Sequence, residues 1–483
     1  MPNTIRILLP IFPYGLKELY FKGRVCVSDD FTITIYITKY TTKNELTANK
    51  LLKRDNVIYG CCGNYLPKEV GNRFYNFLVI ENNSMLKINQ LVINGNSIGT
   101  TSDCVLMLYD YDSIKDSQAI CDTTDDYLTK LVHIIHNDHG LSSRIEHKTE
   151  FGNSQWLASS MFLQHIYNYW KLINWLISTN KKCKQISLKQ GNLMWALVID
   201  VLLGYSVLHL LSQDKKDIST MVMGILEKLI NSLYSLLKWL MGAPVGLKLN
   251  NAFNKMLGNY FSYHVQLWWL FLDVSGEKLD AVLHIFHYMG YVGFTFQTAF
   301  VSDLICIATF HSYCIYVYAA RLFNIQVSGL IALVRLFVGR KYNPLRGGID
   351  SCEYTNQELF VGTVAFTILL LLLPTTALYY IAFTTFRVLS LIVQYLLAKL
   401  IYMVQTLPLY VVSLWLKDSP KVKGNILVEV INQDINSPLI LRIKLFNKSI
   451  PQLVDLFQPP VDVPKQVEWT NLLSNVLVGK QIV

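Results

Sequence analysis

The chain has 483 residues, of which 52% are hydrophobic and 16% are charged, and its formal net charge is +9. Soluble domains carry roughly 25% charged residues, so this composition argues against an ordinary soluble protein and indicates a multi-pass membrane protein. The basic residues lie mainly beside apolar segments, which favours contact with anionic headgroups over nucleic-acid binding. The nine cysteines include no CxxC pair, so a disulfide framework or a zinc ribbon is not expected.

The first 150 residues are mixed and largely polar, and they predict a small cytosolic α/β domain. FTITIYIT, from Phe31 to Thr38, alternates apolar and polar residues as a half-buried strand does. A helical stretch at 42–54 and the short apolar NVIYG follow, as in a β-α-β unit. The apolar run from Ile5 to Phe12 is short and lacks a cleavage site, so no signal peptide is expected.

Residues 151–191 predict an amphipathic helix followed by a basic linker. Trp156, Leu163, Trp170 and Ile177 recur every seven residues, so they form one stripe of a helix that lies on the membrane or against a partner. The lysines that precede the first apolar span place this side of the membrane in the cytosol.

Residues 192–416 predict an all-α membrane region with four to six spans. The segment Val222–Leu240 carries a second amphipathic stripe and indicates an in-plane or packing helix. Asn259–Val274 is either a short span or an interfacial segment. Ala281–Ala320 contains one charge, Asp303, so it forms one long helix or two spans that turn near Ser302 and Asp303. The remaining predicted spans are Leu193–Leu211, Leu359–Phe386 and Phe386–Leu416.

A proline interrupts the most apolar run, TILLLLLPTTALYY, from Thr367 to Tyr380. A proline inside a helix removes one hydrogen bond and costs about 3 kcal/mol or more. In a membrane the freed carbonyl must find a partner, and the hydroxyls of Thr375 and Thr376 can bond back to the preceding turn. The run predicts a kinked packing helix, and the alternative is a discontinuous helix that lines a substrate path.

The loops set the expected orientation. The basic residues between Arg321 and Arg346 place the loop before Leu359 in the cytosol, and an even number of spans returns the tail there. In the tail, residues 417–483, ILVEVI and ILRIKLF flank a polar turn and predict a β-hairpin that adds to a sheet of this chain or of a partner.

Two soluble motifs are candidates for chemistry. Asp110 and Asp112 form a DxD after a predicted strand, where a glycosyltransferase binds a metal and a sugar nucleotide. His133, His136 and His139 could hold a metal with Asp138 or His147. A three-letter motif arises easily by chance and a solvated helix end explains the histidines, so chemistry at either motif is not the favoured interpretation. No strong catalytic fingerprint is present, and neither a catalytic site nor a cofactor is expected.

Two carboxylates, Asp200 and Asp303, lie inside apolar segments. A charge at the bilayer centre costs roughly 2.5 to 3.5 kcal/mol, so each should face protein, water or a basic partner such as Lys399. Structural pairing or contact with a lipid headgroup is the favoured use. A transporter that binds its substrate around both carboxylates remains an alternative, as does a self-sufficient glycosyltransferase that uses Asp110 and Asp112.

Four stretches resemble a known family. They are WLMGAPVGLKLN at 239–250, FHSYCIYVYAARLF at 310–323, the segment from DSCEYTNQELFVGT at 350 through ILLLLLPTTALYY to 380, and LPLY at 407–410. They are similar to the Q-subunit family of the phosphatidylinositol N-acetylglucosaminyltransferase, and the similarity covers about 192–416.

The resemblance implies a multi-pass, non-catalytic subunit of the endoplasmic reticulum membrane. Its complex would transfer N-acetylglucosamine from UDP-N-acetylglucosamine to phosphatidylinositol in glycosylphosphatidylinositol anchor synthesis, and a separate subunit would perform the chemistry. The candidate residues for contact with partner subunits or lipid are Asp200, Trp239, Pro244, Asp303, Arg321, Pro374, Thr375, Thr376, Tyr379 and Tyr380.

Overall fold

The structure is a computed structural model. It describes residues 4–11, 19–27, 32–41, 56–62, 76–82, 86–98, 104–120, 126–138, 160–182, 186–212, 215–242, 250–345, 347–432, 438–464 and 469–481. The chain divides into two compact units, and each unit contains segments that are distant in sequence. The first consists of Met1–Glu150, Thr179–Asn192 and Pro408–Gln458, and the second of Phe151–Ser178, Leu193–Leu407 and Pro459–Val483. The predicted helix at 42–54 lies outside the described residues.

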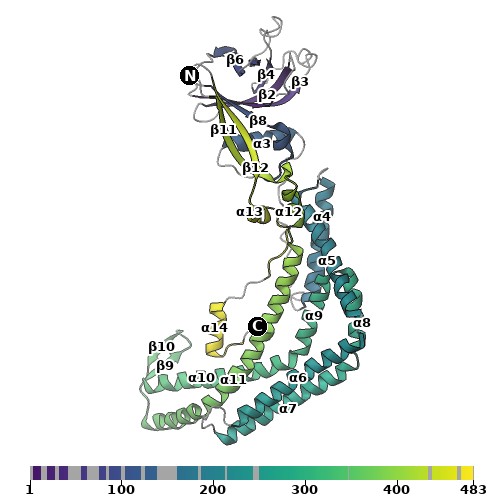
Figure 1. The fold of residues 1–483 in the computed structure, drawn as a ribbon. Helices are drawn as coiled ribbons and strands as arrows, with labels where there is room; N and C mark the ends of the chain where they lie inside the picture. Colours follow the sequence, from purple (N-terminus) through teal and green to yellow (C-terminus); the bar gives the residue numbers. More distant parts are fainter. Residues whose placement is uncertain are drawn as a thin grey trace. The chain divides into compact units, whose positions relative to one another are not determined.

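A ten-stranded mixed sheet forms the first unit (Figure 1). Its order is β11-β12-β8-β1-β3-β2-β4-β5-β6-β7. The strands are β1 (Ile5–Pro10), β2 (Leu19–Val27), β3 (Ile33–Thr41), β4 (Val57–Cys62), β5 (Phe77–Asn82), β6 (Leu86–Ile93), β7 (Asn96–Ile98), β8 (Cys104–Tyr109), β11 (Lys423–Asn432) and β12 (Leu439–Asn447).

The last two strands of this sheet come from the far end of the chain. β11 pairs antiparallel with β12, and β12 pairs parallel with β8, with Leu441 opposite Met107. The alternating tail sequences therefore extend the amino-terminal sheet of the same chain. The hairpin pattern predicted that these strands add to a sheet of this chain or of a partner, and they add to the sheet of this chain.

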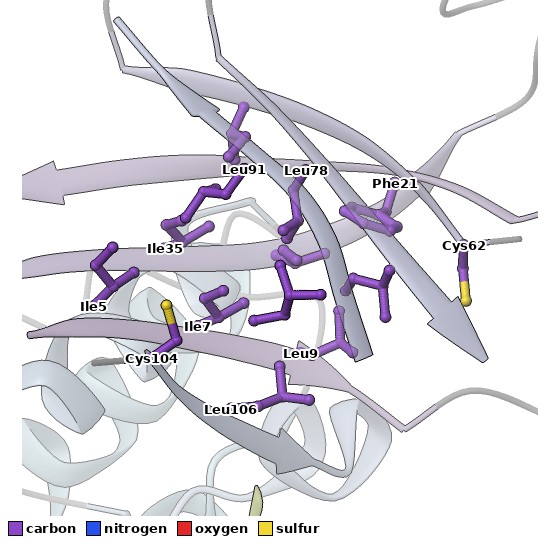
Figure 2. Close-up of a cluster of buried hydrophobic side chains, with 14 of the residues drawn as sticks. Ile5, Ile7, Leu9, Phe21, Ile35, Cys62, Leu78, Leu91, Cys104 and Leu106 are labelled. Carbon is purple, nitrogen blue, oxygen red and sulfur yellow. The ribbon is translucent and has the colours of Figure 1, made fainter. Parts of the chain in front are cut away.

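Apolar side chains fill both faces of the sheet. On one face Ile7, Phe21, Ile35, Leu78 and Leu91 belong to a single buried cluster, and Figure 2 shows these side chains pointing into a common core. On the other face β1 and β8 contribute to a second cluster that includes residues of α2 (Tyr111–Asp116) and α3 (Asp126–Asp138). The first unit is therefore a strand-rich α/β structure.

Short helices complete the first unit. They are α12 (Leu409–Leu416), the 3-10 helix η3 (Pro420–Val422) and α13 (Ile450–Leu456). Asn192, at the start of α5 (Leu188–Ser212), is fully buried and donates its amide to the Phe457 carbonyl over 3.0 Å. Its amide oxygen accepts from the Val411 backbone N–H over 3.0 Å. One side chain thus joins three elements of the unit.

The second unit is helical. Its helices are α4 (Met161–Lys182), most of α5, α6 (Lys215–Met241), α7 (Asn251–Gly276), α8 (Leu279–Val292), α9 (Phe294–Ala308), α10 (Phe310–Phe337), α11 (Asn356–Gln405) and α14 (Trp469–Val478). A small hairpin of β9 (Arg340–Asn343) and β10 (Gly348–Ser351) joins α10 to α11. Figure 1 shows α6 and α7 side by side.

Three helices within the described residues are long and apolar enough to cross a membrane: α5, α10 and α11. The mainly helical architecture with apolar spans agrees with the sequence prediction. The sequence also predicted four to six spans, whereas three described helices have the length and composition of a span. α11 is one continuous helix of 50 residues, where the sequence predicted two separate spans. The residues after Phe386 simply extend the helix that contains Pro374.

The breaks in the segment 281–320 lie at Gly293 and Thr309, on either side of α9. The predicted turn near Ser302 and Asp303 is wrong, because both residues lie inside α9. At the first break, Gly293 is the cap of both α8 and α9, and Asp200 approaches its backbone closely. A Cβ at Gly293 would lie 2.4 Å from Asp200 Oδ2.

Candidate functional site

Pro374 lies inside α11 without ending it. The Thr376 hydroxyl oxygen lies 3.0 Å from the Leu373 carbonyl oxygen and 3.4 Å from that of Leu372, although the carbonyl that Pro374 leaves without its helical donor is that of Leu370. The nearest acceptor of its single proton is Gln326 Oε1 of α10. A threonine that bonds back to the preceding turn was predicted, and its bond to a neighbouring helix joins α11 to α10.

Tyr379, one turn later, is buried in the helical core with only 1% of its surface exposed. Its hydroxyl donates to Asn254 Oδ1 of α7 over 2.9 Å. The Asn254 amide donates in turn to the carbonyls of Leu240 and Met241, each over 3.2 Å. These carbonyls are the last of α6, where a helix supplies no partner of its own, so Asn254 provides donors for the end of α6.

Tyr380 points to another neighbour. Its ring stacks on Phe323 of α10, with centroids 4.6 Å apart and an angle of 6° between the planes. Its hydroxyl donates to the Val476 carbonyl of α14 over 2.8 Å. Asn324 donates to the Val478 carbonyl over 3.2 Å, so α10 and α11 together hold the carboxyl end of α14.

Asp200 of α5 is buried and accepts two hydrogen bonds from Thr295. The backbone N–H of Thr295 bonds to one carboxylate oxygen and its hydroxyl to the other, both over 2.7 Å. His165 Nε2 of α4 lies 3.1 Å from the same hydroxyl oxygen. Since the hydroxyl donates to Asp200, it accepts from the Nε2–H of His165. Three helices therefore meet in one hydrogen-bonded chain.

Asp303 caps the start of α4 from a different helix. Its carboxylate accepts from the Ser160 hydroxyl over 2.5 Å and from the backbone N–H groups of Met161 over 2.8 Å and Phe162 over 3.2 Å. A carboxylate at a helix N-terminus satisfies free N–H groups and suits the helix dipole. Asp200 and Asp303 thus bond to different groups of the chain, Thr295 for the first and the start of α4 for the second.

The other candidate contact residues divide into three groups. Trp239, with 54% of its surface exposed, and Arg321 lie on the surface of the unit. Thr375 is fully buried, and its hydroxyl has no partner among the described residues. Pro244 lies outside the described residues. Contact of these residues with a partner subunit or lipid stays a prediction. The contacts of Thr376, Tyr379 and Tyr380 described above are all within the chain.

The DxD motif has a structural explanation. Asp110 is the N-cap of α2, where its carboxylate accepts from the Asp112 N–H over 3.2 Å and from the Ser113 hydroxyl over 2.5 Å. In the histidine motif, His133 Nδ1 lies 2.6 Å from Asn137 Nδ2, and His139 and His147 are outside the described residues. Where the structure describes the chain, it contains no group of three side chains suited to a metal.

Sequence reasoning missed Asn254, Gln326 and Asn192. Each is an amide in a helix, each has another amide within three residues of it, and each is almost fully buried. An unbonded amide is costly inside a membrane helix and must find a partner, but the sequence does not show which of the neighbouring amides is buried.

Comparison with known proteins now identifies the chain's family. Residues 160–424 match the family model described as "N-acetylglucosaminyl transferase component (Gpi1)". The chain belongs to the Gpi1 family. The match includes α4 to α12, and therefore Asp200, Asn254, Asp303, Gln326 and the tyrosine pair.

Several relatives carry names from one biosynthetic process. The mouse phosphatidylinositol N-acetylglucosaminyltransferase subunit Q is 33% identical over 66% of this chain and 56% of its own length. The human subunit Q is 40% identical over 47% of this chain and 30% of its own length. The fission yeast N-acetylglucosaminyl-phosphatidylinositol biosynthetic protein gpi1 is 28% identical over 50% of the chain and 37% of its length. No solved structure matches.

Proposed function

We propose that this Gpi1-family chain is a non-catalytic membrane subunit that holds together the transferase complex of glycosylphosphatidylinositol anchor synthesis. That complex moves N-acetylglucosamine from UDP-N-acetylglucosamine to phosphatidylinositol at the endoplasmic reticulum. The chain spans little more than half of the mouse relative and less of the others. The activity of the whole relatives is therefore transferred to this chain as a proposal.

The observation that carries this proposal is the use of the polar groups inside the matched helices. Asp200, Asp303, Thr376 and Tyr379 all bond to other helices of the same unit. Such bonds fix helix positions, which is the property that a scaffold subunit needs. The same use supports a scaffold over a transporter, whose carboxylates would have to exchange partners with a substrate.

The sheet also supports an even number of membrane crossings. Because β8 and β12 are neighbours in one sheet, residues 104–109 and 439–447 must lie on the same side of the membrane. α5, α10 and α11 give three crossings, which is an odd number. We therefore assign the fourth crossing to the segment of α8 and α9, since α9 is a shorter apolar helix. The first unit is assigned to the cytosol.

This assignment revises the expected side of the β9–β10 hairpin. The basic residues around Arg340 predicted a cytosolic loop. If α11 crosses once and ends in the cytosol, the hairpin lies in the lumen. The test is Leu345→Cys, at the hairpin tip, treated with a membrane-impermeant maleimide in sealed microsomes. Protection of this cysteine is expected, while Val428→Cys on the exposed edge strand β11 should react. Reaction of the Leu345 variant would show that α11 does not cross in this way.

The scaffold function is tested by copurification and transfer assays. The tagged chain is isolated in mild detergent, and transfer from UDP-N-acetylglucosamine to phosphatidylinositol is measured for the chain alone and for the recovered complex. The complex should be active and the chain alone inactive, and cells without the chain should yield incomplete complexes. Transfer by the chain alone would refute the non-catalytic assignment.

A further inference from the structure

α10 and α11 leave a groove between the end of one helix and the start of the other. The groove has a volume of about 430 Å³, and it is lined by Leu333 and Leu336 of α10, by Val361 and Ala365 of α11, and at the start of α11 by Gln357 and Glu358. Gly362 forms its floor, where a Cβ would lie 3.0 Å from Leu336 Cδ2. Both helices are candidate spans, so this apolar groove belongs to a surface that lipid can reach.

The β9–β10 hairpin at the same end of the helices has the character of a membrane-interface element. Tyr342 and Ile349 are cross-strand neighbours, so their side chains share one face, and both are about half exposed. Leu345 at the tip is 96% exposed. Exposed tyrosine and aliphatic side chains beside a span are typical of the headgroup region. The hairpin therefore indicates where the bilayer surface meets the α10–α11 pair.

Two cations of β9 give this end of the groove its charge. Arg340 and Lys341 are exposed, and neither forms an ion pair within the part of the chain that the structure describes. The nearby acids already have partners. Asp350 accepts from Asn343 Nδ2 over 2.8 Å, and Glu358 accepts from the Thr355 N–H over 2.8 Å and from its hydroxyl over 3.0 Å. Lys341 also attracts the Glu358 carboxylate, which lines the groove, so an anion at this end would bind Arg340 and compete with Glu358 for Lys341.

We infer that this groove binds one acyl chain of an anionic glycerophospholipid of the bilayer, with the lipid phosphate at Arg340 and Lys341. An apolar groove favours an apolar ligand, and the basic residues of the hairpin beside it favour an anionic group on that ligand. A phospholipid supplies both in a single molecule. The inference does not depend on the transferase assignment, since it concerns a bound structural lipid.

The test uses the full chain, with its copurifying proteins, in nanodiscs that contain a phospholipid with a diazirine in one acyl chain. Phosphatidylglycerol and phosphatidylcholine probes are compared, and the labelled peptides are mapped by mass spectrometry. Peptides 331–338 and 357–366 should be labelled at least 3-fold more by phosphatidylglycerol. Ala365→Trp fills the groove and should reduce this labelling at least 5-fold. Val364→Trp adds the same bulk on the exposed neighbouring position and should preserve it.

The charge variant separates headgroup binding from general lipid contact. Arg340→Gln with Lys341→Gln should equalise labelling by the two probes, whereas Arg321→Gln, at an exposed position of α10, should not. Equal labelling of the native chain by both probes would overturn the inference. So would equal effects of the two tryptophan variants, or crosslinks from the groove to a partner protein in place of lipid.

Discussion

Tyr379 of α11 and Asn254 of α7 form a hydrogen bond of 2.9 Å in the helical core, and the Asn254 amide joins this pair to the end of α6. The side-chain amide of Asn254 donates to the last carbonyls of α6. The tyrosine hydroxyl is therefore the donor that occupies the remaining oxygen of the amide.

Tyr379→Phe should destabilise the helical unit by about 1 to 3 kcal/mol, because the buried Asn254 oxygen is left without its donor. Tyr380→Phe should cost less, since the Val476 carbonyl keeps a second bond from the Gly479 N–H over 3.2 Å. Thermal unfolding in detergent measures both. Tyr318→Phe, at a half-exposed position of α10, is the control and should leave the transition unchanged. An equal shift for all three variants would contradict the structural assignment.

Replacing Asp110 should affect folding rather than chemistry. Asp110→Ala removes the N-cap of α2 and should lower the stability of the first unit by about 0.5 to 2 kcal/mol. Asp110→Asn keeps an oxygen for the cap but removes the charge that a metal needs, so transferase activity of the assembled complex should stay nearly native. If Asp110→Asn reduces activity more than 100-fold while the complex still assembles, this motif takes part in the reaction.

The substitution Gly479→Ala tests which contacts hold the end of α14 in place. The φ of Gly479 is +72°, close to the +71° of Gly339 after α10. The Gly479 N–H donates to the Val476 carbonyl, and the Lys480 N–H donates to the Asn475 carbonyl. A Cβ there would lie 2.8 Å from the Phe323 ring. Gly479→Ala should release α14 and make the segment after Gln458 sensitive to protease. Gly347→Ala is a matched control, because Gly347 also has a positive φ of +61° but open space around it. Equal protease sensitivity of the two variants would attribute the effect to backbone strain alone.

Pro374→Ala should strengthen the hydrogen bonding of α11, because the new N–H can donate to the Leu370 carbonyl. Membrane insertion should be normal. We expect less catalytic subunit to copurify, because a straighter α11 would displace Tyr379 and Tyr380 from their partners. Activity should fall in proportion to the recovered complex. Leu371→Ala, at a highly exposed position of the same helix, is the control.

The opposite outcome is that the Pro374→Ala complex is fully recovered but its activity per complex collapses. In that case the proline would serve the reaction or its lipid substrate directly, and the scaffold function of this helix would be wrong.

The sequence predicted the local elements better than their pairing. The alternation in Phe31–Thr38 located β3, and the stripe within Val222–Leu240 located the buried side of α6. Both patterns are local, so they can be recognised without knowing the fold. The parallel pairing of β12 with β8 is not local, and the sequence pattern of a strand does not predict which other strand it pairs with.

The candidate site shows the same limit. Pro374 predicted a kink because the effect of a proline on one helix is known. The bonds from Thr376 to Gln326 and from Tyr379 to Asn254 depend instead on how the helices pack. Asp303 illustrates the difference. Its presence in an apolar segment predicted a protein partner, but the sequence could not indicate that the partner was the first turn of α4.

The pairing of β12 with β8 has a consequence for how the protein is made. β8 is complete at Tyr109, but β12 begins only at Leu439, and all the candidate spans lie between them. At about 5 to 20 residues per second, a ribosome needs tens of seconds to synthesise the intervening segment. During this time the edge of β8 is unpaired in the nascent chain, and an unpaired edge is prone to aggregate. The cell must therefore protect the nascent first unit until membrane insertion is complete and the last strands emerge.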